Sequence, residues 1–411
     1  MKVKILFFSI LALIAVEGFV LLEPDLSFVT NALEKLDVSD KTLAEYAEKV
    51  LAACADAPYA PNCYDTEIPK LMDYISMEDA FSVTRVIQEK DKRYLYCHVL
   101  GHNLSYREAD KDPDKWMDVI TRCPATMCNN GCLHGSMMRR FNSEYLTDEQ
   151  IEALKPDLKI ICEPRGKWKP TPIEQSMCYH AIGHLHMYIT NADLNKSADL
   201  CELVGAKEDG RNYVQTCTEG VFMQVFQPLE PEDFALVANL TPAKNKVVEF
   251  CEPFKSRDMA WEACRRESWP LFRAELMDSK FVEKFCSFSD RPYAYKTCQA
   301  AIMNVITVNL VVDMDDMAKL DKFCMGLSTD LRREECFAYS ASRLMQIDPS
   351  YVQKGLEVCA LSESRGVSTE CYKVMAGYGR QTYHKETKEF EDYCGKMPGQ
   401  WKDMCLNNQS R

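Results

Sequence analysis

Apolar residues recur every three or four positions along most of the chain, and polar residues occupy the positions between them. This spacing puts the apolar side chains on one face of a helix, whereas no long run alternates apolar and polar residues as a half-buried strand does. Short polar segments such as "SFSDRPYAYKT" (287–297) and "ALSESRGVSTE" (360–370) separate the helical stretches. The pattern predicts an all-α fold of amphipathic helices joined by tight turns.

Twenty cysteines mark the ends of these helical stretches. One cysteine closes a stretch, as in "SKFVEKFC" (279–286), and the next opens another, as in "CQAAIMNVITVNLVV" (298–312). A high and even cysteine count is typical of a disulfide framework in an exported protein. We therefore expect helical hairpins whose turns are stapled by disulfides. From residue 162 onward the expected pairs are Cys162–Cys178, Cys201–Cys217, Cys251–Cys264, Cys286–Cys298, Cys324–Cys336, Cys359–Cys371 and Cys394–Cys405.

The N-terminal cysteines follow the same scheme with one variation. The expected pairs there are Cys54–Cys63 and Cys123–Cys132 within hairpins, and Cys97–Cys128 between neighbouring hairpins. An alternative interpretation makes Cys123, Cys128 and Cys132 a thiolate metal cluster. The even count and the signs of export favour disulfides, because oxidised sulfur is not available as a thiolate ligand.

The first cysteine of each hairpin recurs about every 35 to 50 residues, which is the period of helical-hairpin repeats. The chain resembles disulfide-bearing tetratricopeptide-like arrays in general arrangement only, since it lacks their residue signatures. We predict one continuous, right-handed α-solenoid of about ten hairpins. Residues 19–250 would carry the histidine cluster described below, and residues 251–411 would continue the disulfide-stapled repeats without it.

The chain begins "MKVKILFFSILALIAVEGF", with a basic start and an apolar run, which predicts a signal peptide over residues 1–18. The alternative is a retained membrane anchor. No later segment is long and apolar enough to span a bilayer, so we expect no membrane span after cleavage. Cleavage would remove two lysines and one glutamate and so change the net charge from -13 to -14. Such an acidic, secreted or otherwise extracytoplasmic protein is not expected to bind nucleic acid.

Six of the seven histidines lie in four adjacent N-terminal hairpins or their connections, notably in "CYHAIGHLHMY" (178–188). When the hairpins are aligned on their second cysteine, the position two residues later forms a series. It holds His134, His180 and Glu219, and then Arg266, Ala300, Ala338, Lys373 and Asn407, while His98 joins the series if Cys97 is aligned with Tyr179. The hairpins continue without histidine, so histidine is not needed to form them.

The spacing of these histidines suits a metal site. His98 with His102, and His180 with His184, are four residues apart, which puts each pair on one helix face with Cβ atoms roughly 6 Å apart. The expected ligands are His98, His102, His134, His180, His184 and Glu219, with His186 as a further candidate on another face of its helix. Such a set suits one or two ions of zinc, copper, iron or manganese.

Glycines accompany the candidate ligands. Gly101 and Gly183 precede the second histidine of each pair, and Gly135 and Gly220 follow His134 and Glu219. A glycine inside a helix costs roughly 1 kcal/mol relative to alanine. We therefore expect either close helix packing or space for a ligand at these positions.

Common catalytic signatures are missing from the sequence. It contains no H-E-x-x-H, C-x-x-C-H, G-x-S-x-G, P-loop or dinucleotide-binding motif. We predict an exported, disulfide-rich metalloprotein, with enzymatic activity and the small-molecule or protein ligand left open. The alternative is a non-catalytic extracellular repeat scaffold that binds a protein or glycan. For the histidine set itself, the alternative to metal binding is a histidine-lined groove that is pH-sensitive or that holds an anionic ligand with help from Arg139 or Arg140.

Overall fold

The computed structural model describes residues 39–94, 97–124, 127–141, 145–166, 168–229, 231–313, 315–347, 351–367 and 370–407. Within these ranges the regular structure consists of 21 α-helices, α3 to α23, with short 3-10 and π segments and no strand. The all-α prediction is confirmed. The predicted signal peptide, residues 1–18, lies outside the described residues.

The N-terminal half of the chain contains ten of these helices. They are α3 (Asp40–Ala53), α4 (Ala60–Glu67), α5 (Met77–Lys90), α6 (His98–Asp110), α7 (Trp116–Arg122), α8 (Gly131–Phe141), α9 (Asp148–Ile160), α10 (Pro172–Ile189), α11 (Leu194–Gly205) and α12 (Val214–Phe226). None of the helices in the described part of the chain is both long and apolar enough to cross a membrane.

The C-terminal helices are shorter on average. They are α13 (Pro231–Val237), α14 (Val247–Cys251), α15 (Asp258–Glu267), α16 (Ser279–Cys286), α17 (Pro292–Thr307), α18 (Met317–Met325), α19 (Asp330–Ile347), α20 (Val352–Ser364), α21 (Glu370–Thr382), α22 (Lys388–Gly395) and α23 (Gln400–Asn407).

Ten disulfides join the cysteines, and they are the ten pairs expected from the sequence. The S–S distances run from 1.92 Å in Cys394–Cys405 to 2.10 Å in Cys97–Cys128. Every cysteine lies within the described residues and none is free. Cys123, Cys128 and Cys132 all take part in these bonds, which excludes the alternative of a thiolate metal cluster.

One series of helices runs from His98 to Asn407. Each member packs against the next in the order α6, α8, α10, α12, α15, α17, α19, α21 and α23. From α8 onward the members are the second helices of the hairpins, and each begins one to six residues before the second cysteine of its hairpin. Helix α6 begins directly after Cys97. These contacts are those that stacked hairpins would make. The right-handed solenoid itself stays a prediction.

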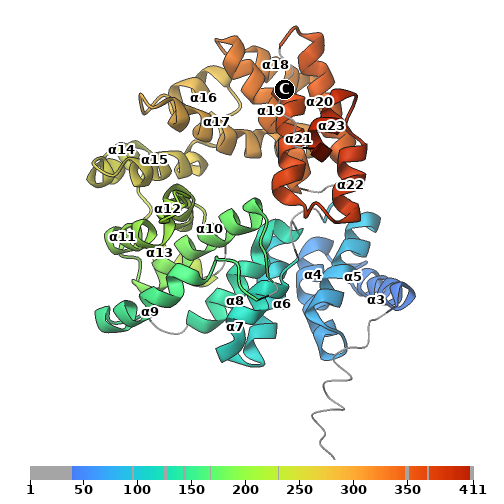
Figure 1. The fold of residues 1–411 in the computed structure, drawn as a ribbon, viewed down its shortest axis with the longest axis vertical. Coiled ribbons are helices and arrows are strands. Elements are labelled where there is room, and N and C mark those ends of the chain that lie inside the picture. The colour runs from blue at the N-terminus through green and yellow to red at the C-terminus, as the bar shows by residue number, and fades with distance from the viewer. Residues whose placement is uncertain are drawn as a thin grey trace, which may run out of the picture.

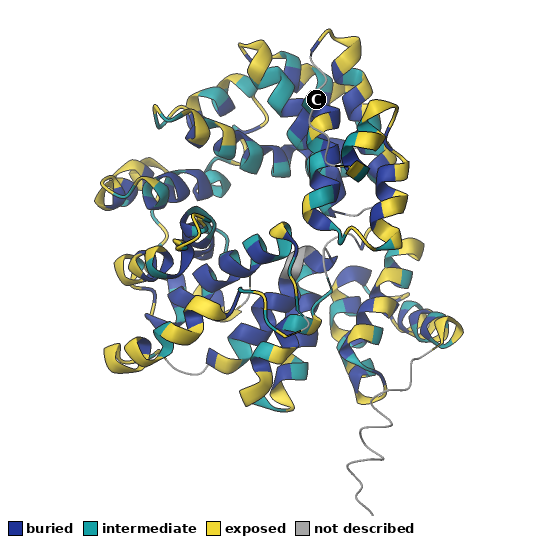
Figure 2. Ribbon diagram, in the orientation of Figure 1, coloured by how far each residue is buried: buried dark blue, intermediate teal, exposed yellow. Residues whose placement is uncertain are grey.

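The apolar core falls into two clusters. The first runs from Leu43 to Cys264 and the second from Leu276 to Cys405. Figure 2 shows the buried residues along the faces where neighbouring helices meet. The first cluster extends past residue 250, and the predicted division into 19–250 and 251–411 stays a prediction.

The chain curves back on itself, so that the red C-terminal helices return to the N-terminal half in Figure 1. Helix α10 contacts α21, which lies almost two hundred residues later in the sequence. His384 Nε2 lies 3.7 Å from the Glu174 carboxylate at the start of α10. In a simple open array each repeat contacts only its neighbours. The contact between α10 and α21 departs from that arrangement.

Candidate metal centre

Three adjacent helices of the series, α6, α8 and α10, carry the clustered histidines. The start of α10 is fixed by a capping box, in which Thr171 N donates to Glu174 Oε2 at 2.6 Å and Glu174 N donates to Thr171 Oγ1 at 3.3 Å. Pro172 occupies the first helical position, where its missing N–H costs nothing. The register of α10 therefore places His180 and His184 on the face toward α8.

Glycine allows these helices to approach closely. A Cβ atom at Gly135 of α8 would lie 2.2 Å from the backbone oxygen of His102, and one at Gly220 of α12 would lie 2.1 Å from the backbone oxygen of His180. Neither position has room for any side chain. Of the two explanations expected from the sequence, close helix packing therefore applies to both glycines.

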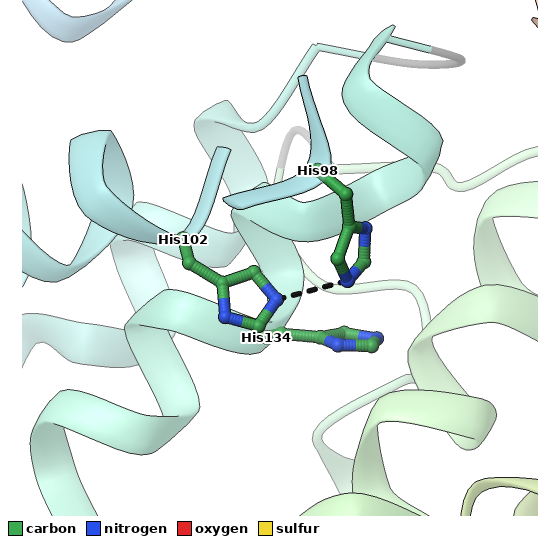
Figure 3. Close-up of side chains that lie close together, drawn as sticks. All are labelled: His98, His102 and His134. Carbon is green, nitrogen blue, oxygen red and sulfur yellow. Dashed lines mark hydrogen bonds between the residues drawn. The ribbon is translucent and has the colours of Figure 1, made fainter. Parts of the chain in front are cut away.

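His98, His102 and His134 form the tightest group. The Nε2 atoms of His98 and His102 are 3.0 Å apart, and one ring nitrogen from each of the three residues lies within 4.8 Å of the others. Figure 3 shows the three rings, from α6 and α8, turned toward one another. Two nitrogens on a tetrahedral zinc ion with bonds of 2.0–2.1 Å are about 3.3 Å apart. The group thus has nearly the spacing that a shared ion requires.

His180 and His184 form a second pair on the other side of His134. Their Nε2 atoms are 3.2 Å apart. The ring centre of His134 lies 4.9 Å from that of His184 and 6.0 Å from that of His180, compared with 5.0 Å from His98. The structure therefore brings together all five histidines that the sequence grouped, with His134 in the middle.

Hydrogen bonds fix the orientation of one ring in each pair. His98 Nδ1 donates to the backbone oxygen of Cys128 at 3.2 Å, and His184 Nδ1 donates to Gln224 Oε1. A neutral imidazole that donates through Nδ1 has a lone pair on Nε2, which is the atom directed at its pair partner. Metal-binding histidines usually donate such a hydrogen bond from the ring nitrogen that does not bind the metal.

Gln224 was not among the residues singled out from the sequence. It is 2 % exposed, in α12. The available signal was a single amide in the apolar stretch "VFMQVF" (221–226). The backbone oxygen of Cys128 gave no signal at all, because any residue has one.

Burial favours the neutral form of three rings in the cluster. The pKa values of His134 and His180 lie well below the usual range, chiefly because both rings are removed from water and also because other histidines surround them. Burial likewise lowers the pKa of His184, against an opposing effect of its bond to Gln224. Neutral imidazole is the form that binds a metal ion, so burial favours the ligand form of these three rings.

Glu219 is engaged elsewhere. Its Oε1 lies 2.5 Å from Nη2 of Arg266, whose side chain is 2 % exposed. Arg266 also binds Glu267 through Nε at 3.0 Å. Both acids hold a buried guanidinium, and the part of Glu219 as a metal ligand stays a prediction.

His186 lies apart from the five clustered rings. It is fully buried, with Nδ1 3.5 Å from Cys201 Sγ and 3.7 Å from Cys217 Sγ. The three residues have the spacing of a metal-binding group. The two sulfurs are bonded to each other, however, so they are not thiolate ligands. His186 as an additional ligand stays a prediction.

A small cavity of about 10 Å³ adjoins the cluster between α8 and α10. Its polar lining comes from His134 and His184, and Tyr188 also lines it. The remaining residues that line it are apolar: Met137, Met138, Phe141, Ala181 and Leu185. A cavity of this size has room for about one water molecule. A small ligand could therefore reach the ring atoms of these two histidines.

Comparisons with other proteins give no match. The chain matches no protein-family model, and searches of curated proteins and of solved structures return no significant similarity.

Proposed function

We propose that the protein is an exported metalloprotein that binds a transition-metal ion through His98, His102 and His134. The observation that carries this proposal is that three ring nitrogens from two helices lie within 4.8 Å of one another. The bond from His98 to the Cys128 carbonyl supports it, because a neutral ring that donates through Nδ1 carries a lone pair on Nε2, the nitrogen directed at His102.

Export is supported by two features. Ten disulfides fit an oxidising compartment, and the N-terminal sequence has the pattern of a signal peptide. We also propose that the chain is a right-handed solenoid, because the second helices of consecutive hairpins pack against one another as they would in such an array.

Imidazole ligands suit zinc, copper, iron and manganese. Three histidines leave a coordination position for water or another small ligand. An ion in such a site acts as a Lewis acid or lowers the pKa of bound water. Enzymatic activity would depend on what occupies that position, and we assign no catalytic residue.

The test is the elemental content of the full chain, purified with its disulfides intact and without a His-tag or chelators. We expect at least one transition-metal ion per chain by mass spectrometry of the elements. His102→Ala and His134→Ala should each lower the metal content. His384→Ala should not, because His384 is on the surface and bound to Glu174.

The opposite result has a clear meaning. If the purified chain carries no stoichiometric metal and takes up none at neutral pH, the metal proposal is wrong. A repeat scaffold that binds a protein or glycan would then replace it.

A further inference from the structure

His134 stands between two equivalent pairs of histidines. Its ring centre lies 5.0 and 5.1 Å from those of His98 and His102, and 6.0 and 4.9 Å from those of His180 and His184. Helix α8, which carries it, packs against both α6 and α10. One imidazole thus belongs to the group with His98 and His102 and also lies beside the pair of His180 and His184.

The two pairs have the same local construction. In each, the histidines are four residues apart, and the Nε2 atoms are separated by 3.0 Å in α6 and 3.2 Å in α10. In each, one ring donates through Nδ1 to a carbonyl oxygen of a neighbouring segment. If His180 and His184 only supported the site at His98, His102 and His134, a lone pair oriented by the bond from His184 to Gln224 would serve no purpose.

We propose that the centre holds two transition-metal ions that share His134. One ion would be bound by His98 and His102, and the other by His180 and His184, while the two ring nitrogens of His134 would each bind one ion. This inference rests on the proposed function and adds the second ion and the bridge.

The bridge accounts for charge as well as geometry. Neutral imidazole has one lone pair, so His134 must lose its N–H proton to solvent in order to bind two ions. The resulting imidazolate carries a negative charge between the two cations and reduces their repulsion. With metal–nitrogen bonds of 2.0–2.1 Å, the ions would be about 6 Å apart.

The cavity beside His134 and His184 suits the second ion. It lies between α8 and α10, on the side of the α10 pair, and has room for about one water molecule. Met137, Phe141 and Leu185 contribute apolar walls. A small uncharged ligand such as water is therefore what we expect to complete the coordination of this ion.

Metal stoichiometry tests the second ion. The full, disulfide-bonded chain is stripped of metal with a chelator and then dialysed against Zn²⁺ or Co²⁺ at neutral pH. We expect two bound ions per chain. A value of one overturns this inference and leaves the proposed function intact, whereas a value of zero overturns both.

Single variants test how the ligands are divided. His184→Ala should keep one ion, and so should His98→Ala, because each removes a ligand from one pair. His134→Ala should weaken both ions, by at least about tenfold each. His384→Ala is the control and should keep two. Retention of two tight ions by His184→Ala, with helical spectra unchanged, would overturn the assignment.

Cu²⁺ tests the bridge without any variant. Two Cu²⁺ ions joined by imidazolate couple their spins, so the low-temperature electron paramagnetic resonance signal should integrate to well below two spins per chain. His134→Ala loaded with Cu²⁺ should lose this coupling. A full two-spin signal from the unmodified protein with two bound ions would exclude the shared imidazolate.

Discussion

Arg266 Nη2 lies 2.5 Å from Glu219 Oε1, and the two residues occupy the same position in consecutive hairpins. This position therefore changes from histidine to glutamate to arginine as the series of helices passes from α8 to α15. Coulombic repulsion from Arg266 also contributes to the low pKa of His180. Glu219 neutralises part of the charge of the buried Arg266 guanidinium.

Glu219→Gln distinguishes a structural role of Glu219 from a role in metal binding. Loss of the charged partner should lower the free energy of unfolding by about 2 kcal/mol, because Arg266 is buried. Metal content should stay unchanged. Denaturant unfolding and elemental analysis measure the two effects. The matched control is Glu249→Gln, which removes an exposed ion pair and should change stability little. A loss of metal in Glu219→Gln would instead support Glu219 as a metal ligand, as the sequence predicts.

Gly220→Ala tests the close approach of α10 and α12. The added Cβ would lie 2.1 Å from the backbone oxygen of His180, so the helices must separate. We expect a loss of stability of about 2 kcal/mol or more and weaker metal binding, measured by thermal unfolding and equilibrium dialysis. Gly377→Ala is the control, since it lies in α21 with nothing within 4 Å of its added Cβ. It should stabilise the chain slightly. Equal behaviour of the two variants would contradict this account.

The buried His186 predicts a loss of stability in acid. Removal from water lowers its pKa from 6.5 to about 3, so the folded state binds its proton more weakly than the unfolded state does. Above pH 6.5 the proton equilibrium of His186 therefore does not lower the free energy of unfolding. Between pH 6.5 and about pH 3 it lowers that free energy by up to about 1.4 kcal/mol per pH unit. Urea unfolding of the metal-free chain between these pH values measures it. His186→Leu should show a shallower slope than the unmodified chain.

Disulfide mapping tests the hairpins one by one. Non-reducing peptide analysis should recover Cys286–Cys298, Cys324–Cys336 and Cys359–Cys371 as separate pairs. The double variant Cys359→Ala/Cys371→Ala should lower the free energy of unfolding by about 3 kcal/mol, since the bond closes a short loop. Bonds between distant hairpins, or free thiols at these positions, would contradict the structure.

The sequence predicted the features that are local. Helices and cysteine pairs follow from patterns within one hairpin, and the partners Cys286 and Cys298, for example, are only 12 residues apart. The gathering of His134 with His180 and His184 also followed, because stacked hairpins bring equivalent positions together. These predictions needed only a periodic signal and one repeat of context.

Other features depend on contacts that no local pattern encodes. The bond from His184 to Gln224 joins residues 40 positions apart, and the contact of His384 with Glu174 closes the chain over a much longer distance. The pairing of Arg266 with Glu219 lies between the two cases. Both residues were placed in the same series, but the charge relation between them depends on how closely α12 and α15 pack.

The short span of the disulfides also bears on how such a chain matures. The two cysteines of each bond are separated by between 9 and 31 residues. A polypeptide that enters an oxidising compartment N-terminus first can therefore form each bond before much more of the chain has emerged. Oxidative folding would advance from hairpin to hairpin, and the contact between α10 and α21 would form last, when the completed C-terminal helices reach the helix that carries His180 and His184.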